Sequence, residues 1–240
     1  MKKSIFLAAV AFMLMSVSAS AQFMQSSGSK SSAAVEDVFS TFDLTYSPVT
    51  MKASYDGDSI TDDFNGFSLN WAQARLLTDQ LPVYLQYGAG VQFTWKTDTS
   101  SDDYYDMKVK NTTTFLTVKV PVNVLYNFAI PNTNLSVMPY VGLNAQIHVL
   151  GQSKTTTTYE DDKETSKMSY FSKDDMEDPY NRFVLGWQIG AMVSYEKYFV
   201  GIGYNGPVTS LYKNGDFKIK TSQVNISLGI KHLTYFNGNL

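Results

Sequence analysis

The chain has 240 residues and a formal net charge of −3, with 19 basic side chains, 22 acidic side chains and no cysteine. The absence of cysteine excludes disulfides, thiolate metal sites and a lipid-modified N-terminal cysteine. The acidic balance argues against nucleic-acid binding, which uses a basic surface.

The start of the chain predicts an export signal. Lys2 and Lys3 precede a mostly apolar stretch at 4–15, and Ala19-x-Ala21 has the spacing of a cleavage site. We therefore expect residues 1–21 to be a signal peptide that is removed after Ala21. The apolar stretch is too short for a membrane anchor, because a spanning helix needs about 20 apolar residues. The serine-rich stretch at 22–35 predicts a disordered periplasmic leader.

Between residues 36 and 236, apolar and polar side chains alternate in eight segments. Residues 116–120, for example, read Leu-Thr-Val-Lys-Val. Period two is the signature of a strand, whereas a helix would spread these side chains around its axis. The predicted strands cover residues 39–47, 64–73, 83–96, 116–126, 135–149, 183–194, 198–204 and 223–231. Pro121 and Pro139 fall inside two of them, and we expect a bulge at each.

The connections between these strands alternate in length. We expect long loops at 48–63, 97–110 and 151–181, with a hairpin at 205–219, and short turns at 75–81, 127–134 and 195–197. Asn214-Gly215 is a strong hairpin signal and Asp56-Gly57 a weaker one, so some strands are expected to continue as hairpins above the membrane. An even number of antiparallel strands with long loops on one side is the arrangement of outer-membrane barrels. Both ends of the chain then lie on the short-turn side, in the periplasm.

Glycine recurs on the polar face of the predicted strands. Glycine inside a strand marks a sharp bend or a close approach, and an eight-stranded barrel has an interior only wide enough for side chains. The pattern therefore favours a narrow barrel over a wide pore. These glycines are Gly88, Gly90, Gly142, Gly186, Gly190, Gly201, Gly203 and Gly229.

The chain resembles the small eight-stranded outer-membrane barrels: the membrane domain of the outer-membrane protein A family, the outer-membrane protein X type and the Bacteroidota outer-membrane β-barrel domain families. The resemblance rests on the signal ending Ala19-Ser20-Ala21-Gln22, the alternation of 116–126 and the aromatic Tyr235 and Phe236 near the close of the chain. It implies an all-β fold, a single eight-stranded antiparallel up-and-down transmembrane β-barrel over residues 36–236, with 237–240 as a short tail. It also implies the bacterial outer membrane as the location.

Polar side chains on the inner face are the candidate site. Two readings are open: a narrow polar conduit, or a satisfied network that plugs the barrel. Because a buried charge must be paired, and because Asp43 can lie beside Lys231 when the barrel closes, the plug is favoured. The predicted lumen network consists of Asp43, Gln86, Gln92, Lys119, Asn123, Asn144, Gln146, His148, Gln188 and Lys231.

Acidic residues concentrate in the predicted long loops, which hold 17 of the 22 acids. Carboxylate oxygens are ligands for hard cations such as Ca²⁺ and Mg²⁺, so divalent cations are one candidate partner. The alternative is a solvated acidic surface, which is the commoner meaning of a charge run. The stretch 98–106 lacks the ligand order and central glycine of an EF-hand, so the solvated surface is favoured.

Catalysis is not expected. Some barrels of this type modify lipid A with a His–Ser pair, and His148 lies on the inner face near the outer rim. A nucleophile needs a base within hydrogen-bond reach and an orienting third group, and a nearby serine such as Ser153 does not supply these. We expect no enzyme, no cofactor and no resident metal.

The sequence therefore predicts a structural or surface-interaction role, such as adhesion or host contact through acidic loops. The alternatives are a narrow porin-like channel for small solutes, a lipid-modifying enzyme and a soluble lipocalin-like carrier. The expected partners are outer-membrane lipid and lipopolysaccharide, the barrel-assembly machinery and a ligand at the loops, but no nucleic acid. A lipocalin would place the apolar rows inside, so the direction in which they face separates it from a membrane barrel.

Overall fold

The computed structural model describes residues 37–78, 80–102, 107–159 and 162–233. The predicted signal peptide, leader and tail lie outside these ranges. Within them the chain forms strands and connections, and no helix is long and apolar enough to cross a membrane. The strands are β1 (Val38–Tyr46), β2 (Val49–Tyr55), β3 (Asp58–Thr78), β4 (Leu81–Asp102), β5 (Met107–Tyr126), β6 (Phe128–Ala129), β7 (Leu135–Tyr159), β8 (Asp162–Ser169), β9 (Phe183–Tyr195), β10 (Tyr198–Pro207), β11 (Tyr212–Asn214) and β12 (Phe217–Leu233).

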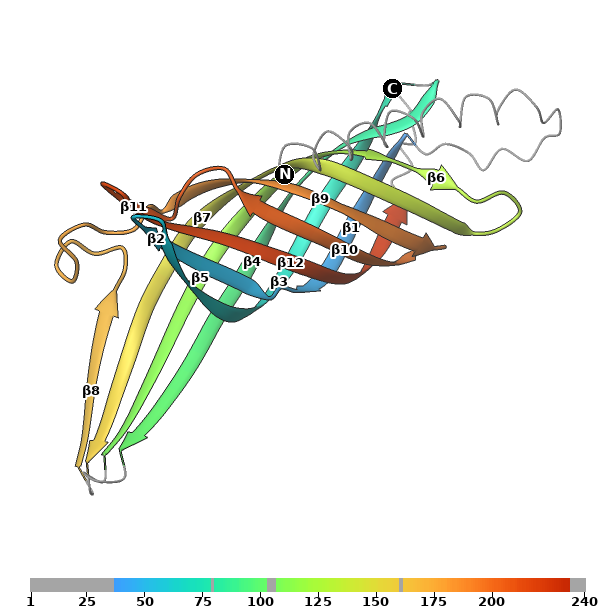
Figure 1. The fold of residues 1–240 in the computed structure, drawn as a ribbon. Helices are drawn as coiled ribbons and strands as arrows, with labels where there is room; N and C mark the ends of the chain where they lie inside the picture. The colour runs from blue at the N-terminus through green and yellow to red at the C-terminus, as the bar shows by residue number, and fades with distance from the viewer. Residues whose placement is uncertain (1–36, 79, 103–106, 160–161, 234–240) are drawn as a thin grey trace, which may run out of the picture. The chain divides into compact units, whose positions relative to one another are not determined.

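Eight strand positions close into a ring (Figure 1). The order is β1-β12-β10-β9-β7-β5-β4-β3, and β3 pairs back with β1. β2 continues β1 after Ser47 and Pro48 and pairs with the same two neighbours, β3 and β12. Every pairing in the ring is antiparallel. The predicted eight-stranded antiparallel barrel is therefore confirmed.

The apolar rows face outward, as the alternation predicted. Leu69 is 54% exposed and Leu228 is 64% exposed, whereas Gln92 is 4% exposed and Asn144 is 2% exposed. A soluble lipocalin-like barrel would have the opposite arrangement, so that alternative is wrong. The outward surface is apolar because it faces hydrocarbon, and the polar atoms are inside because there they can pair with one another.

The segments expected to be long loops are in large part strand. β4 runs on to Asp102, β5 starts at Met107, and β7 reaches Tyr159 before β8 pairs back along it. In Figure 1 the ends of these four strands project beyond the ring and diverge from β2 and β11. Hydrophobic alternation does not detect them because water contacts both faces. Their signal is instead the threonine at 97, 99, 112–114 and 155–158, a residue enriched in strands.

Two hairpin turns follow the glycine signals. Asp56 and Gly57 link β2 to β3 with φ of 45° and 91°, which is the left-handed pair that a type I′ turn requires. The second turn differs by one residue from the prediction: Asn214 pairs with Phe217, so Gly215 and Asp216 form the turn, with Gly215 at φ 55°.

The bulges expected at the two prolines are absent from the described ladders. Pro121 pairs with Asn144, and Pro139 pairs with Ala191, without a change of register. On its other side each proline falls at a break in the ladder, since proline has no N–H to donate. The register shift in β5 instead lies between Leu116 and Thr117.

Charge on the outward face should block assembly. Val120→Asp places a carboxylate on the lipid side of β5, where a charge at mid-bilayer costs up to about 2–4 kcal/mol, somewhat less for Asp than for Lys. We expect the variant to be depleted from the heat-modifiable, membrane-inserted fraction on gels. Val208→Asp, in the connection after β10, is the control and should insert normally. Normal insertion of Val120→Asp would contradict the facing of β5.

Candidate functional site

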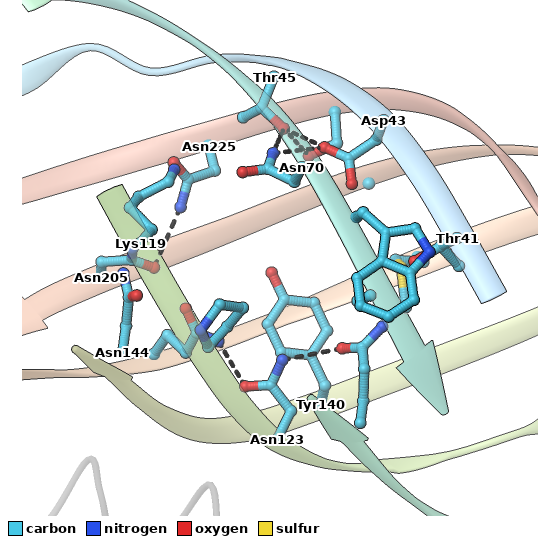
Figure 2. A pocket seen from close by; sticks show the side chains of 18 of the residues that line it. Thr41, Asp43, Thr45, Asn70, Lys119, Asn123, Tyr140, Asn144, Asn205 and Asn225 are labelled. Carbon is cyan, nitrogen blue, oxygen red and sulfur yellow. Dashed lines mark hydrogen bonds between the residues drawn. The ribbon is translucent and has the colours of Figure 1, made fainter. Parts of the chain in front are cut away.

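Two of the predicted charged residues, Asp43 and Lys119, line the same cavity in the middle of the barrel. Asp43 on β1 accepts hydrogen bonds from Thr45 Oγ1 at 2.6 Å and Asn70 Nδ2 at 2.7 Å. Lys119 on β5 is buried and its Nζ donates to Ser68 Oγ at 3.1 Å. Figure 2 shows the Asp43 group on one side of a cavity whose lining also includes Lys119. The charges are therefore held within a hydrogen-bonded lining.

Lys231 lies nearer than Asp43 does to the end of the barrel where β1 begins and β12 stops. The β1–β12 register pairs Asp43 with Gly229 and Lys231 with Thr41. The Lys231 ammonium lies 4.8 Å from the centre of the Phe39 ring. The sequence hypothesis was right that these strands are neighbours, and the structure adds this aromatic contact for Lys231.

Amide side chains link the adjacent strands β4 and β5, and they link β5 to β9 past the intervening β7. Asn123 Nδ2 donates to Gln86 Oε1 at 2.8 Å, and Gln188 Nε2 donates to Asn123 Oδ1. Asn144 is buried beside them, and Gln146 is half-buried. Four strands, β4, β5, β7 and β9, are thus joined or lined by amides at one level of the barrel.

A second amide chain, which contains Gln92, connects the other half of the ring. Gln92 Nε2 donates to Gln223 Oε1 at 3.1 Å, and Gln223 Nε2 donates to Asn225 Oδ1 at 2.9 Å. Asn225 Nδ2 then donates to Asn205 Oδ1 at 3.0 Å, and Ser47 Oγ donates to Asn225 Oδ1 at 2.7 Å. The alternation placed Gln223 and Asn225 on the inner face, but it did not predict that they join a network. Asn205 fell in the hairpin expected at 205–219, whereas β10 continues to Pro207.

The polar middle surrounds a cavity of about 90 Å³. Asp43, Lys119, Tyr140, Asn123 and Asn225 are among its lining residues (Figure 2). This volume admits a few water molecules but is well below the roughly 300–1,000 Å³ of ligand pockets. The cavity is therefore suited to internal hydration.

The barrel has two ends, which we name by their connections: the short-turn end, where β3 meets β4 and β9 meets β10, and the opposite long-loop end. At the short-turn end, large apolar side chains fill the lumen. They form one buried cluster of Phe39, Ala74, Tyr84, Leu125, Met138, Met192 and Phe199. The alternation placed most of these residues on the polar face, but it did not predict that all of them gather at one end. Their position near the short turns was the available signal.

Apolar side chains also close the lumen at the long-loop end. Val49, Phe64, Phe115 and Phe171 form a buried cluster there, against which Met51, Tyr170 and Tyr180 pack. Burial, together with the neighbouring Tyr170 and Tyr212, raises the pKa of the Tyr180 phenol to about 12. Phe171 belongs to the connection after β8, so this connection folds back onto the barrel mouth.

His148 lies beside this aromatic cluster. Its Nδ1 is 2.8 Å from Thr117 Oγ1, and its ring stacks on Phe171 with centroids 5.9 Å apart. Ser153, the serine considered from the sequence, donates to Asn111 Oδ1 at 2.6 Å instead. The geometry of His148 is that of a packed ring with one hydrogen bond.

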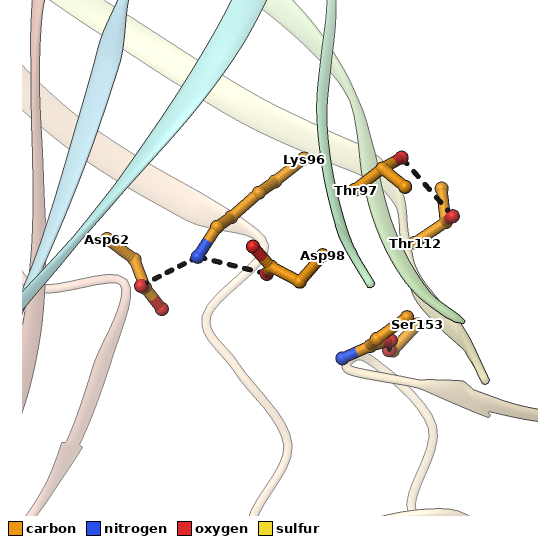
Figure 3. A network of polar contacts seen from close by, with 7 residues as sticks. Asp62, Lys96, Thr97, Asp98, Thr112 and Ser153 are labelled. Atoms are coloured by element: carbon orange, nitrogen blue, oxygen red, sulfur yellow. Dashed lines mark hydrogen bonds and ion pairs between the residues drawn. The ribbon is translucent and has the colours of Figure 1, made fainter. Parts of the chain in front are cut away.

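Lys96 links two of the acidic residues at the long-loop end. Its Nζ lies 2.8 Å from Asp62 Oδ1 and 3.0 Å from Asp98 Oδ2 (Figure 3). These hydrogen bonds raise the pKa of Lys96. Among the residues that the structure describes, no group of three or more His, Asp or Glu side chains is placed to hold a metal ion. The acids at 103, 106, 160 and 161 lie outside the described residues.

The model of the family described as "Outer membrane protein beta-barrel domain" matches residues 81–213 of the chain. This range runs from the start of β4 to β11 and covers more than half of the sequence. It agrees with the family resemblance drawn from the alternation and the signal. No curated protein matches.

Several solved structures are similar at low identity. Ail, the attachment invasion locus protein of Yersinia pestis, is 13% identical with a TM-score of 0.37, covering 81% of this chain and 99% of that one. Neisserial surface protein A is 16% identical with a TM-score of 0.32, covering 80% and 97%. The N-terminal barrel domain of Pseudomonas aeruginosa OprF is 17% identical with a TM-score of 0.26, covering 78% and 96%.

Close packing inside the lumen can be tested at one glycine. A methyl group at Gly203 on β10 would overlap the Tyr140 hydroxyl, and overpacking of this kind costs about 1–3 kcal/mol. We expect Gly203→Ala to lower the free energy of unfolding by that amount, measured by urea titration in lipid vesicles. Tyr140→Phe should restore most of the loss.

Gly201→Ala is the matched control for this test. Gly201 lies on the same strand and face, but its added Cβ would come no nearer than 3.3 Å to Met192 Cγ. It should lose clearly less stability than Gly203→Ala. Equal losses that Tyr140→Phe does not relieve would contradict the packing described for Tyr140.

Proposed function

Because the chain belongs to the outer membrane protein β-barrel domain family, we propose that it is a non-conducting outer-membrane scaffold that holds its long-loop end outward for surface interactions. Adhesion and contact with a host are the roles of this kind that fit the proposal. The short-turn end, together with the N- and C-terminal ends of the chain, lies in the periplasm. A barrel that is inserted into the outer membrane and resides there requires as partners outer-membrane lipid, lipopolysaccharide and the barrel-assembly machinery.

One observation carries the proposal: side chains close the lumen at both ends and leave only a small cavity in the middle. Apolar clusters occupy both ends, and hydrogen-bonded amides occupy the middle. A conducting pore needs a continuous polar path wide enough for a hydrated solute. The rings of Tyr84 and Phe199 at one end and of Phe115 and Phe171 at the other oppose such a path.

The long-loop end supports an outward role by its construction. β4, β5, β7 and β8 form a regular sheet that continues past the ring, with strands paired out to Asp102 and Tyr159. A sheet of this kind holds its side chains in fixed positions, whereas an irregular loop would not. Such a surface can be recognised by a partner with little loss of conformational entropy.

Conductance separates this role from that of a channel. We expect the folded protein, inserted in planar bilayers, to give no single-channel steps at any voltage, because both ends of the lumen are packed. A porin added to the same bilayers is the positive control for insertion and recording. Reproducible conductance steps in the porin's size range would contradict the scaffold role and support a channel.

A further inference from the structure

The projecting sheet has two faces of opposite charge, and the strand register determines which residues share a face. Directly paired residues in antiparallel strands point to the same side, and alternate residues point to opposite sides. From Lys96 to Asp102, β4 pairs with β5, β5 with β7 and β7 with β8, and no register shift falls in this part. Each row of four residues can therefore be assigned to one face.

The outer face continues the surface that faces lipid in the barrel. Along β4, alternate side chains point outward: Phe93, then Trp95, then Thr97. Figure 3 shows Thr97 and Thr112 on one side of β4, opposite to Lys96 and Asp98. The outer face thus starts directly beyond Phe93 and Trp95, and the inner face starts above the lumen.

The outer face carries lysine and hydroxyl side chains and no acid. Its three rows contain five lysines, six threonines and one serine. All five lysines are exposed, and within the described residues none of them takes part in an ion pair. The residues are Thr97, Thr112, Lys154 and Lys167; Thr99, Lys110, Thr156 and Thr165; and Ser101, Lys108, Thr158 and Lys163.

The inner face has the opposite character. Its rows carry the acids of the sheet, namely Asp98, Asp102, Asp162 and Glu164, together with Lys96, which is paired with Asp62 and Asp98. The acids expected in the long loops thus occupy only one face of the sheet. A count of acids along the chain does not show this separation, because adjacent residues of opposite charge point to opposite faces.

The neighbouring hairpins repeat the arrangement. Lys52, Lys218 and Lys220 fall in the outward rows of β2 and β12, and Lys213 on β11 pairs directly with Lys218. Together with the five lysines of the sheet, nine of the 17 lysines of the chain point outward at the long-loop end. Asp63 is the one acid in the outward rows of β2 and β3 described here.

We propose that this lysine face binds the anionic phosphate headgroups of the membrane leaflet that surrounds the long-loop end. The first lysine row lies two residues beyond Trp95, about 7 Å along the strand, and the last lies six residues beyond, about 20 Å. Because membrane strands tilt by about 35–45°, the rows rise less than this above the membrane. Lysine stems can lie along the sheet while their ammonium groups reach the phosphates.

Charge complementarity and continuity with the lipid-facing surface select this occupant. A juxtamembrane basic cluster is attracted to an anionic surface, and the attraction is strongest within a Debye length. Threonine and serine hydroxyls between the lysines add hydrogen-bond donors for phosphate oxygens. The proposal depends on membrane insertion of the barrel and is independent of the proposed surface role.

The test replaces all five sheet lysines, Lys108, Lys110, Lys154, Lys163 and Lys167, by glutamine. Folded protein in uncharged maltoside micelles is titrated with phosphatidylglycerol, and the Kd is measured by microscale thermophoresis at about 0.1 M salt, where the Debye length is about 10 Å. We expect the variant to bind at least tenfold more weakly than the parent. Replacement of the same lysines by arginine keeps the charge and should retain the parent affinity.

A second variant controls for effects of the sheet as a whole. Neutralising the inner face with Asp98→Asn, Asp102→Asn, Asp162→Asn and Glu164→Gln should leave phosphatidylglycerol binding equal or stronger. Folding of every variant is checked by heat-modifiable migration. If the glutamine variant does not fold, the salt dependence of the parent decides: we expect its binding to be lost at 0.5 M salt, because exposed charges are then screened.

Three outcomes would overturn the proposal. The first is an unchanged Kd for the folded glutamine variant, and the second is parent binding that persists at 0.5 M salt. The third is a variant that loses binding to soluble dextran sulfate but keeps its affinity for phosphatidylglycerol, which would make the face a site for extracellular polyanions. None of these results bears on conductance, so the proposed scaffold role is tested separately.

Discussion

The structure depends on one constraint: in hydrocarbon, each backbone N–H and C=O must find its partner within the protein. An open sheet would leave an edge unpaired, so β1 pairs with β12 on one side and with β3 on the other. Closure then determines which side chains are apolar and which are polar, since one face of every strand must meet lipid and the other must meet the lumen. The exposure of Leu69 and Leu228 and the burial of Gln92 and Asn144 follow from it.

A ring of only eight strands leaves an interior that side chains fill. Here the filling is layered: an apolar cluster near the short turns, amides and the Asp43–Lys119 level in the middle, and aromatic rings near the long loops. Buried amides and charges stabilise only when their hydrogen bonds are made, which the chains through Asn123 and Asn225 achieve. With the lumen occupied, the surfaces that remain for interaction are the outer ones.

Much of the barrel could be predicted from the sequence because burial in lipid imposes period two on every spanning segment. The same logic fails beyond the membrane, where water contacts both faces. Threonine content, and not alternation, marks the far ends of β4, β5 and β7, whereas β8, with Thr165 as its one threonine, carries neither signal. The network members could be placed on the inner face, but partners such as Ser68 for Lys119 depend on register, which alternation alone does not set. The prolines show another limit, since a missing N–H interrupts one ladder without shifting it.

The direction in which each residue of β5 faces is the central claim, and the absence of cysteine makes it directly measurable. Single cysteines introduced at each position from 116 to 124, spin-labelled in lipid vesicles, report contact with oxygen in hydrocarbon or with a water-soluble nickel chelate. The account predicts oxygen maxima at 116, 118, 120, 122 and 124, with low accessibility to both reagents at 117, 119, 121 and 123. A flat profile, or maxima of the nickel chelate at 117, 119 and 123, would contradict it.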